Sequence, residues 1–298
     1  MSQGKAISAL RTSDEAHIEP VLTIDNRSYL FYGDNLTIMK TLFPSYAGKI
    51  TVIYADPPFY TGDTFFSSGA LKGGEEGRIH AYSDLWKGGR EEYLAFMRER
   101  IALFRELLSP AGSLYLHCDW RTSARFKLLL DDIFGERNYV NECIWYYKTG
   151  GAPRKLGYGK KHDTIHFVVK DRNKAVWNPQ RERSYLSHRY GYSNVEIKSD
   201  ERGYYRDVLL RDVWDIPALR GNQPERVDYP TQKPEALLEK IILSSSNEGD
   251  IVADFFCGSG TTGVVAQRLN RRWILCDSSK YAISITVERL RGRRRIKA

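Results

Sequence analysis

A buried strand, a glycine-rich turn and a helix follow one another near the carboxyl end of the chain. Residues 250–256 (DIVADFF) read as an apolar strand, residues 257–263 (CGSGTTG) form the turn, and residues 264–269 have helical spacing. Glycines let the backbone of such a turn approach a ligand closely, and open α/β sheets bind ligands at the carboxyl ends of their strands. The unit predicts an α/β fold with a nucleotide-like ligand at this turn.

A second strand ends in a carboxylate at the spacing that an adenosine cofactor requires. Residues 273–276 (WILC) are apolar and lead into Asp277, which follows Gly258 by 19 residues. An acidic residue at about this offset commonly binds ribose hydroxyl groups. We therefore expect an adenosine-containing cofactor between the turn and Asp277.

Two prolines end another buried strand much earlier in the chain. Residues 50–55 (ITVIYA) are mostly β-branched and aromatic, and Asp56, Pro57, Pro58 and Phe59 follow directly. Because proline cannot donate a hydrogen bond to a neighbouring strand, the strand stops there. A carboxylate and a carbonyl could then accept hydrogen bonds from an exocyclic amine, with an aromatic ring stacked on its base. A plain turn with a packed ring is the alternative.

Strand and helix signals alternate over the first half of the chain. Residues 20–60 contain two strand signals around a short helix, residues 91–108 and about 121–134 have helical spacing, and residues 113–118 read as a strand. Such alternation predicts a mostly parallel sheet with crossover helices. The glycine-rich stretch 61–90 is expected to form a mobile loop over a substrate cleft or a passive surface loop.

Positive charge is concentrated in one part of the chain. The net charge of the 298 residues is +8, and residues 148–206 contain 14 Lys and Arg against six Asp and Glu, so this interval accounts for all of it. Cationic side chains interleaved with tyrosines favour a polyanionic partner, although a solvated surface insertion has the same composition. The candidate contacts are Arg154, Lys155, Lys160, Lys161, Arg181, Arg183 and Arg189.

The four cysteines are dispersed and form no C-x-x-C pair, so neither a metal site nor a disulfide framework is expected. The sequence also lacks a Pro-Cys motif. This argues against enzymes that methylate carbon 5 of cytosine, because they need a nucleophilic cysteine. Without a basic-then-apolar leader or an apolar run of membrane-spanning length, we expect a soluble cytoplasmic protein with loosely ordered residues 1–20.

The proline motif and the glycine motif, in this order, resemble the β class of S-adenosylmethionine-dependent DNA amino-methyltransferases. The similarity covers roughly residues 28–170 and 226–290. Four further segments resemble recurrent elements of that family: residues 31–36 (FYGDNL), 108–115 (LSPAGSLY), 161–165 (KHDTI) and 229–235 (YPTQKPE).

The resemblance implies a class I methyltransferase fold, in which a Rossmann-like, doubly wound and mostly parallel α/β sheet has a permuted motif order. It implies a catalytic half in residues 1–147, an inserted target-recognition region in residues 148–225, and a cofactor-binding half with a basic tail in residues 226–298. The two halves must meet for catalysis. We therefore expect the loops at Asp56 and Gly258 to adjoin where the strand order reverses.

The resemblance also implies a site-specific transfer of a methyl group from S-adenosylmethionine to an amine of a base flipped out of duplex DNA. Asp56 and the Pro57 carbonyl would each accept one amine hydrogen, and Phe59 would stack on the base, with Pro58 completing the catalytic motif. Asp-Pro-Pro is associated mainly with adenine and Ser-Pro-Pro with cytosine, so Asp56 favours the N6 amino group of adenine. Phe59 stands where tyrosine is usual, which retains stacking but loses a hydroxyl.

The implied cofactor contacts come from the glycine motif, from the strands beside it and from the segments that precede both motifs. These residues are Asp34, Thr231, Lys233, Asp254, Phe256, Gly258, Ser259, Gly260, Thr261 and Asp277.

Other interpretations stay open beside the adenine enzyme. A cytosine-N4 methyltransferase would share nearly every motif, and a non-catalytic DNA-binding module could keep the methyltransferase fold. An amine methyltransferase of RNA or protein would more usually carry Asn-Pro-Pro-Tyr after its glycine motif. Double-stranded DNA is the implied partner, with a second copy of the chain and a cognate restriction endonuclease as further candidates.

Overall fold

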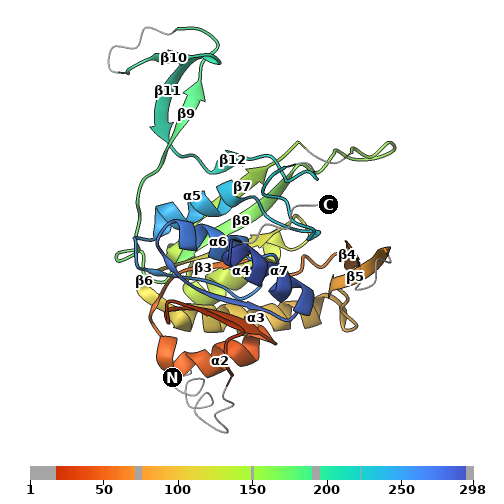
Figure 1. Cartoon of the computed structure of the whole chain (residues 1–298). Coiled ribbons are helices and arrows are strands. Elements are labelled where there is room, and N and C mark those ends of the chain that lie inside the picture. Colours follow the sequence, from red (N-terminus) through yellow and green to blue (C-terminus); the bar gives the residue numbers. More distant parts are fainter. Residues whose placement is uncertain (1–17, 71–75, 149–150, 190–194, 222, 293–298) are drawn as a thin grey trace.

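The computed structural model describes residues 18–70, 76–148, 151–189, 195–221 and 223–292, which form a central sheet with helices on both faces (Figure 1). The helices are α2 (Asn35–Tyr46), α3 (Gly89–Leu107), α4 (Ser123–Phe134), α5 (Glu235–Ser245), α6 (Thr261–Arg268), α7 (Lys280–Leu290) and the 3₁₀ turn η2 (Glu136–Asn138). Across the sheet, the strands are β1 (Leu22–Ile24), β2 (Ser28–Tyr32), β14 (Arg272–Asp277), β13 (Ile251–Asp254), β3 (Ile50–Ala55), β6 (Leu108–Cys118), β8 (His162–Val169), β7 (Tyr139–Tyr146) and β12 (Val213–Asp215).

The middle of the sheet is parallel. Strands β2, β14, β13, β3 and β6 run in one direction, whereas β8 is antiparallel to both β6 and β7. Every residue of β3 and β13 is buried, as expected of parallel strands that are covered on both faces. The predicted mostly parallel sheet with crossover helices is confirmed.

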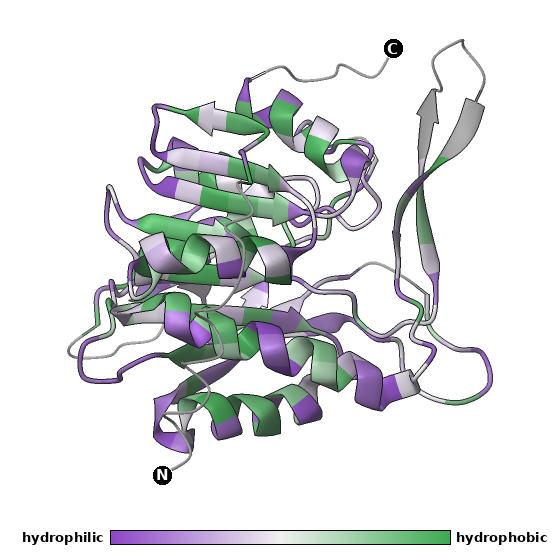
Figure 2. Cartoon of the chain, turned by 90° about the horizontal axis from the view of Figure 1, so that it is seen from below, coloured by the Kyte–Doolittle hydropathy of each residue, from purple (hydrophilic) through white to green (hydrophobic). Residues whose placement is uncertain are grey.

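Two helix layers cover the sheet. Helices α2, α3 and α4 contribute to one apolar core, and α5, α6 and α7 contribute to the other. Because side chains alternate along a strand, Ile53 and Ala55 of β3 belong to the first core, and Val52 and Tyr54 belong to the second. Figure 2 shows the apolar strands between helices whose residues are partly polar.

The strand order reverses between β3 and β13. The chain leaves β3 towards β6 on one side through α3, and it leaves β13 towards β14 on the other side through α6. The two strands pair in parallel, with Val52 opposite Val252 and Ile53 opposite Ala253. Their carboxyl ends therefore open into one crevice, the usual ligand site of such sheets. The expected adjacency of the Asp56 and Gly258 loops is confirmed.

The stretch 61–90 differs from the expected loop. It contains an antiparallel hairpin of β4 (Thr64–Ala70) and β5 (Glu76–Ser83). The rings of Phe65 and Tyr82 stack with centroids 4.6 Å apart, and this hairpin packs against Tyr229 and α7. Aromatic cross-strand pairing therefore outweighs the flexibility that the glycines suggested.

The basic interval is divided between two structures. Strand β8, which lies within it, belongs to the central sheet. A separate three-stranded sheet, β9 (Arg181–Tyr185), β10 (Lys198–Asp200) and β11 (Gly203–Leu209), projects away from the body as a finger (Figure 1). No helix within the described ranges is long and apolar enough to cross a membrane. Most of the predicted loosely ordered segment, residues 1–20, lies outside those ranges.

Candidate active site

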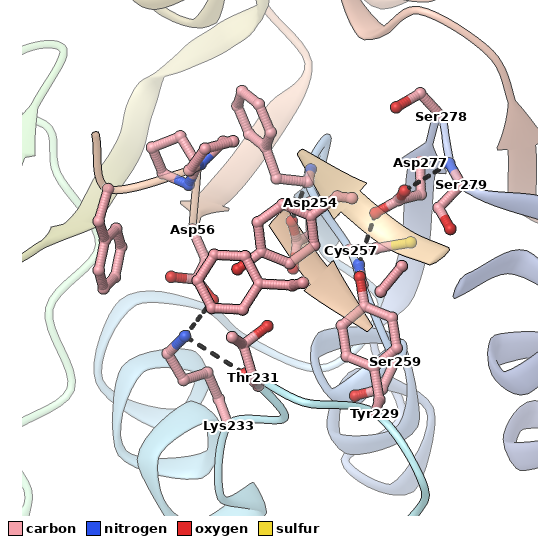
Figure 3. Close-up of a pocket in the computed structure, with 18 of the residues that line it drawn as sticks. Asp56, Tyr229, Thr231, Lys233, Asp254, Cys257, Ser259, Asp277, Ser278 and Ser279 are labelled. Carbon is pink, nitrogen blue, oxygen red and sulfur yellow. Dashed lines mark hydrogen bonds and ion pairs between the residues drawn. The ribbon is translucent and has the colours of Figure 1, made fainter. Parts of the chain in front are cut away.

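A cavity of about 840 Å³ lies at the carboxyl ends of β3 and β13 (Figure 3). Both sequence motifs line it, because their strands are neighbours. The lining includes every predicted catalytic residue and nine of the ten predicted cofactor residues: Asp56, Pro57, Pro58, Phe59, Asp34, Thr231, Lys233, Asp254, Phe256, Gly258, Ser259, Thr261 and Asp277. Gly260 is the exception, since it is the residue just before α6 and lies against Thr286.

The two oxygens of Asp56 have different surroundings. Oδ2 forms an ion pair with Lys233, whose Nζ also lies 5.3 Å from the centroid of the Phe59 ring (Figure 3). Oδ1 is buried and has no hydrogen-bond partner among the described residues. A buried acceptor without a partner is costly, so Oδ1 is set up to receive a donor from a ligand. Lys233, which was predicted to contact the cofactor, thus forms an ion pair with Asp56, the carboxylate that was predicted to be catalytic.

Helix α3 supports the turn at Pro57 and Pro58 through the side chain of Tyr93. The hydroxyl of Tyr93 donates a hydrogen bond to the carbonyl of Pro58 at 2.7 Å, and Tyr93 is fully buried. Tyr60 continues the turn with a φ of 61° and packs its ring against Tyr93, with centroids 5.6 Å apart. Tyr60 therefore supports the turn, while Phe59 lines the cavity.

Asp277 ties the glycine turn to the strand beside it. The Gly258 N–H donates to Oδ2 and the Ser279 N–H donates to Oδ1, each at 2.8 Å (Figure 3). A carboxylate offers about four acceptor sites, so capacity remains for hydroxyl groups of a ligand. Burial raises the pKa of Asp277. At Gly258, φ is +51° and a Cβ would lie 3.1 Å from the Tyr229 ring, so another residue would strain the backbone and press against this ring.

Asp254 is buried at the end of β13. It accepts hydrogen bonds from the Thr262 hydroxyl at 2.5 Å and from the Phe256 N–H at 3.0 Å. Burial, reinforced by the negative charges of Asp56 and Asp277, raises the pKa of Asp254 to about 7. A cationic ligand in the cavity would therefore favour its ionised form.

Asp34 caps helix α2 at the edge of the cavity. Its Oδ1 accepts the Thr37 N–H at 3.0 Å, and its Oδ2 pairs with the buried Arg100 at 2.9 Å. Partial burial opposes ionisation, but the Thr37 N–H and the Arg100 guanidinium outweigh it and lower the pKa of Asp34. On the other side, Arg289 donates to the Ser259 carbonyl and to the Thr261 hydroxyl, both at 2.9 Å.

Three residues beside the motifs were not predicted as site residues, although Asp163 and Tyr229 lie in two of the segments that resemble the family. Tyr229 packs against Gly258, and His117 and Asp163 lie behind Asp56. His117 is fully buried, with Nδ1 3.8 Å from Asp56 Oδ1 and Nε2 3.2 Å from Asp163. The polar residues at the end of β6 and the start of β8 could have indicated a site in the sequence. Their proximity, however, follows only from the pairing of these two strands.

The predicted DNA contacts form two groups outside the cavity. The connection between β7 and β8 carries Arg154, Lys155, Lys160 and Lys161, and the finger carries Arg181 and Arg183, with Arg189 just beyond β9. Arg154 and Lys155 are exposed, whereas Arg183 pairs with Asp200 at 2.8 Å. The positive charge of Arg183 is therefore partly neutralised within the finger.

Neither metal nor thiol chemistry is suggested by the described part of the chain. No group of His, Cys, Asp and Glu there could hold a metal ion. All four cysteines are buried, and burial raises the pKa of Cys257 beside the glycine turn, which disfavours a thiolate.

The chain matches the family described as DNA methylase (N6_N4_Mtase) over residues 50–288, most of its length. It belongs to this DNA methylase family. Among curated proteins, DNA adenine methyltransferase YhdJ of Escherichia coli (strain K12) is 30% identical over 275 residues, 91% of this chain and 85% of that protein. Type II methyltransferase M.HpaI of Haemophilus parainfluenzae is 34% identical over 199 residues, 67% of this chain and 60% of that protein.

Solved structures of methyltransferases have the same fold. The M1.HpyAVI–SAM complex superposes with a TM-score of 0.57 at 23% identity, covering 88% of this chain and 98% of that one. The cytosine-N4-specific PvuII DNA methyltransferase has a TM-score of 0.61 at 18% identity, covering 92% of this chain and 89% of that one. The predicted DNA methyltransferase and its Rossmann-like sheet are confirmed, and the SAM complex agrees with the predicted cofactor. The roles of individual side chains stay predictions.

Proposed function

We propose that the protein transfers a methyl group from S-adenosylmethionine to the N6 amino group of adenine in double-stranded DNA. The observation that supports this most is the asymmetry of Asp56. One oxygen is held by Lys233, and the other is a buried acceptor that has no hydrogen-bond partner among the described residues. Asp56 and the glycine turn line the same cavity. The similarity to a protein named as a DNA adenine methyltransferase supports the same base.

The residues around the glycine turn fit an adenosine sulfonium cofactor. Asp277 keeps acceptor capacity for ribose hydroxyls, and Gly258 leaves room that a Cβ would fill. Asp254, whose pKa is about 7, would balance the positive charge of the sulfonium when ionised. When bound, S-adenosylmethionine supplies an electrophilic methyl group.

The contribution of the chain is to orient the amine. The lone pair of an aromatic amine is delocalised into its ring, which makes the nitrogen a weak nucleophile. Asp56 Oδ1 accepts one N–H and the Pro57 carbonyl accepts the other, which localises the lone pair on one side. Charge-assisted hydrogen bonds and positioning account for most of the rate gain.

The target base has to leave the duplex before this geometry can form. Unstacking and unpairing cost a few kcal/mol. Stacking on Phe59 recovers about 1–3 kcal/mol of this cost. Phe59 lines the cavity beside Asp56, so the stacked base and the accepting oxygen belong to one pocket.

Two surfaces are proposed to contact the DNA outside the pocket. The connection between β7 and β8 would hold phosphates through its exposed cations, and the finger of β9–β11 would provide the base contacts of the target-recognition region. Lys160 lies 4.2 Å above the Trp120 ring, which steadies one side of the connection. A homodimer and a cognate restriction endonuclease stay predictions of the family resemblance.

Nucleoside mass spectrometry tests the proposal. The protein would be incubated with duplex DNA and S-adenosylmethionine, and the digested DNA analysed, with Asp56→Ala as the control. N6-methyladenine that is absent with the variant is the expected result. N4-methylcytosine would keep the mechanism and contradict the base, and a product from the variant equal to the wild type would contradict the role of Asp56.

A further inference from the structure

A chain of polar side chains lies behind Asp56 and links three strands of the sheet. The Tyr54 hydroxyl on β3 contacts His117 Nδ1 on β6 at 2.7 Å, and His117 Nε2 contacts Asp163 Oδ2 on β8 at 3.2 Å. The Tyr147 hydroxyl donates to the other oxygen of Asp163 at 2.9 Å. Tyr54, Tyr147 and Asp163 all line the cavity, whereas His117 is fully buried beneath it.

The partners of His117 determine which ring nitrogen is basic. Burial opposes ionisation of Asp163, but its hydrogen bonds with His117 and with the Tyr147 hydroxyl lower its pKa, so it accepts from Nε2–H. Burial raises the pKa of Tyr54 well above its ordinary value, so its hydroxyl keeps its proton and can donate. In the neutral ring, Nδ1 is therefore the acceptor, and this nitrogen faces Asp56.

Methylation of an amine releases a proton that needs an acceptor. Asp56 Oδ2 is occupied by Lys233, which leaves Oδ1 to accept the proton from the methylated nitrogen. Oδ1 is buried and would be covered by the bound amine, so a second base beside it would take the proton on. His117 Nδ1, 3.8 Å away, is a base within reach once this distance shortens to about 3 Å.

We propose that His117 and Asp163 form a relay that carries the reaction proton from Asp56 to the cavity wall; this inference rests on the proposed function. The N–H bond of the methylated amine breaks and an O–H bond forms at Asp56 Oδ1. The Tyr54 hydroxyl turns away from His117 Nδ1, whose lone pair then takes the proton from Asp56 Oδ1, while the Nε2 proton moves to Asp163 Oδ2. Asp163 lines the cavity, and it releases the proton to water there.

A second buried histidine provides a matched control. His166 on β8 is 1% exposed, its Nδ1 contacts the Tyr139 hydroxyl at 2.8 Å, and its Nε2 contacts the Ser123 hydroxyl at 3.3 Å. Both histidines are thus buried and hydrogen-bonded to a tyrosine. Only His117 lies between two cavity carboxylates, Asp56 and Asp163. If His117 had only a structural role, substitution of either histidine would lower stability and leave the rate of methyl transfer unchanged.

The test compares His117→Gln with His166→Gln. Single-turnover methyl transfer would be measured in H₂O and D₂O, together with KM for DNA and Kd for S-adenosylhomocysteine. His117→Gln is expected to slow transfer about 100-fold and to increase the solvent isotope effect, because proton loss becomes rate-limiting. Its KM and Kd should stay within about threefold, since neither ligand contacts this buried ring. His166→Gln should lower the melting temperature yet keep the wild-type rate and isotope effect.

Asp163→Asn is the second variant, in case His117→Gln does not fold. The amide keeps a hydrogen bond to the ring but cannot take up the proton, so the same slower rate and larger isotope effect are expected. Wild-type rates in either variant would contradict the relay. A wild-type protein that yields no N-methylated base would instead contradict the proposed function, and the relay with it.

Discussion

At the scale of single residues, Asp254 couples the stability of the ligand-free protein to pH. Burial raises its pKa to about 7, from an ordinary value of 3.8. Between about pH 4 and 7 the folded protein keeps a proton that the unfolded chain has lost, so the free energy of unfolding falls as pH rises and levels off above 7.

Asp254→Asn is expected to remove this dependence. The amide is neutral and similar in shape, so between pH 5 and 8 the variant should lose about 2–3 kcal/mol less stability than the wild type. Urea unfolding of both proteins at the two pH values measures the difference. Parallel pH profiles would show that Asp254 is ionised in the folded protein at pH 5.

At the scale of elements, the start of α6 depends on a glycine. Gly260 has a φ of +75°, and a Cβ would lie 2.5 Å from Cγ2 of the buried Thr286. Gly249 has a φ of +82° with nothing within 4 Å of a Cβ, so alanine there would have a similar backbone strain without the clash.

Alanine at the two positions separates strain from packing. Gly249→Ala is expected to cost about 1–2 kcal/mol of unfolding free energy, from the left-handed backbone alone. Gly260→Ala should cost roughly 1–3 kcal/mol more and weaken binding of S-adenosylhomocysteine, because the turn has to shift. Chemical denaturation and calorimetric titration measure both effects, and equal losses at the two sites would rule out the clash.

The two basic elements should differ in their response to salt. Arg154 and Lys155 are exposed on the connection between β7 and β8, whereas Arg183 in the finger is paired with Asp200. If both connection side chains contact phosphates, the double substitution to alanine should reduce the slope of log K against log salt by about 1.8. Arg183→Ala should change that slope less. DNA-binding titrations between low and moderate salt would contradict this if the two slopes changed equally.

Elements with a strong local pattern were predictable from the sequence. The apolar spacing of residues 91–108 predicted α3 within two residues, and the strands at Ile50–Ala55 and Ile251–Asp254 lie where their apolar runs indicated. The hairpin β4–β5 was missed because its stability comes from ring stacking of Phe65 on Tyr82 and from packing against α7, neither of which has a local sequence period.

At the scale of the whole molecule, the finger is joined to the body through two adjacent chain ends. Arg181 and Leu209 are paired across β9 and β11, so residues 182–208 can be replaced by a short glycine-serine linker without separating the central strands. The shortened protein is expected to keep its fold and cofactor binding and to lose methylation at specific sites. Differential scanning fluorimetry with S-adenosylhomocysteine and sequencing of methylated positions test this, and an unchanged target site would contradict the recognition role.

The proximity of residues far apart in the sequence was predictable only where the family resemblance supplied an order of the strands. Asp56 and Gly258 were expected to adjoin on that ground, and the pairing of β3 with β13 bears this out. The ion pair of Lys233 with Asp56 and the packing of His117 behind it depend on side-chain directions in the folded sheet. No spacing in the sequence contains that information.

The most direct test of the account is single-turnover methyl transfer by Asp56→Asn, measured beside its affinity for S-adenosylhomocysteine. The amide keeps the shape of the carboxylate but loses the negative charge that the amine requires. We predict a rate at least about 100-fold lower, with an affinity within about threefold of the wild type. A variant that transfers methyl groups at the wild-type rate would contradict the central claim that the free oxygen of Asp56 orients the amine.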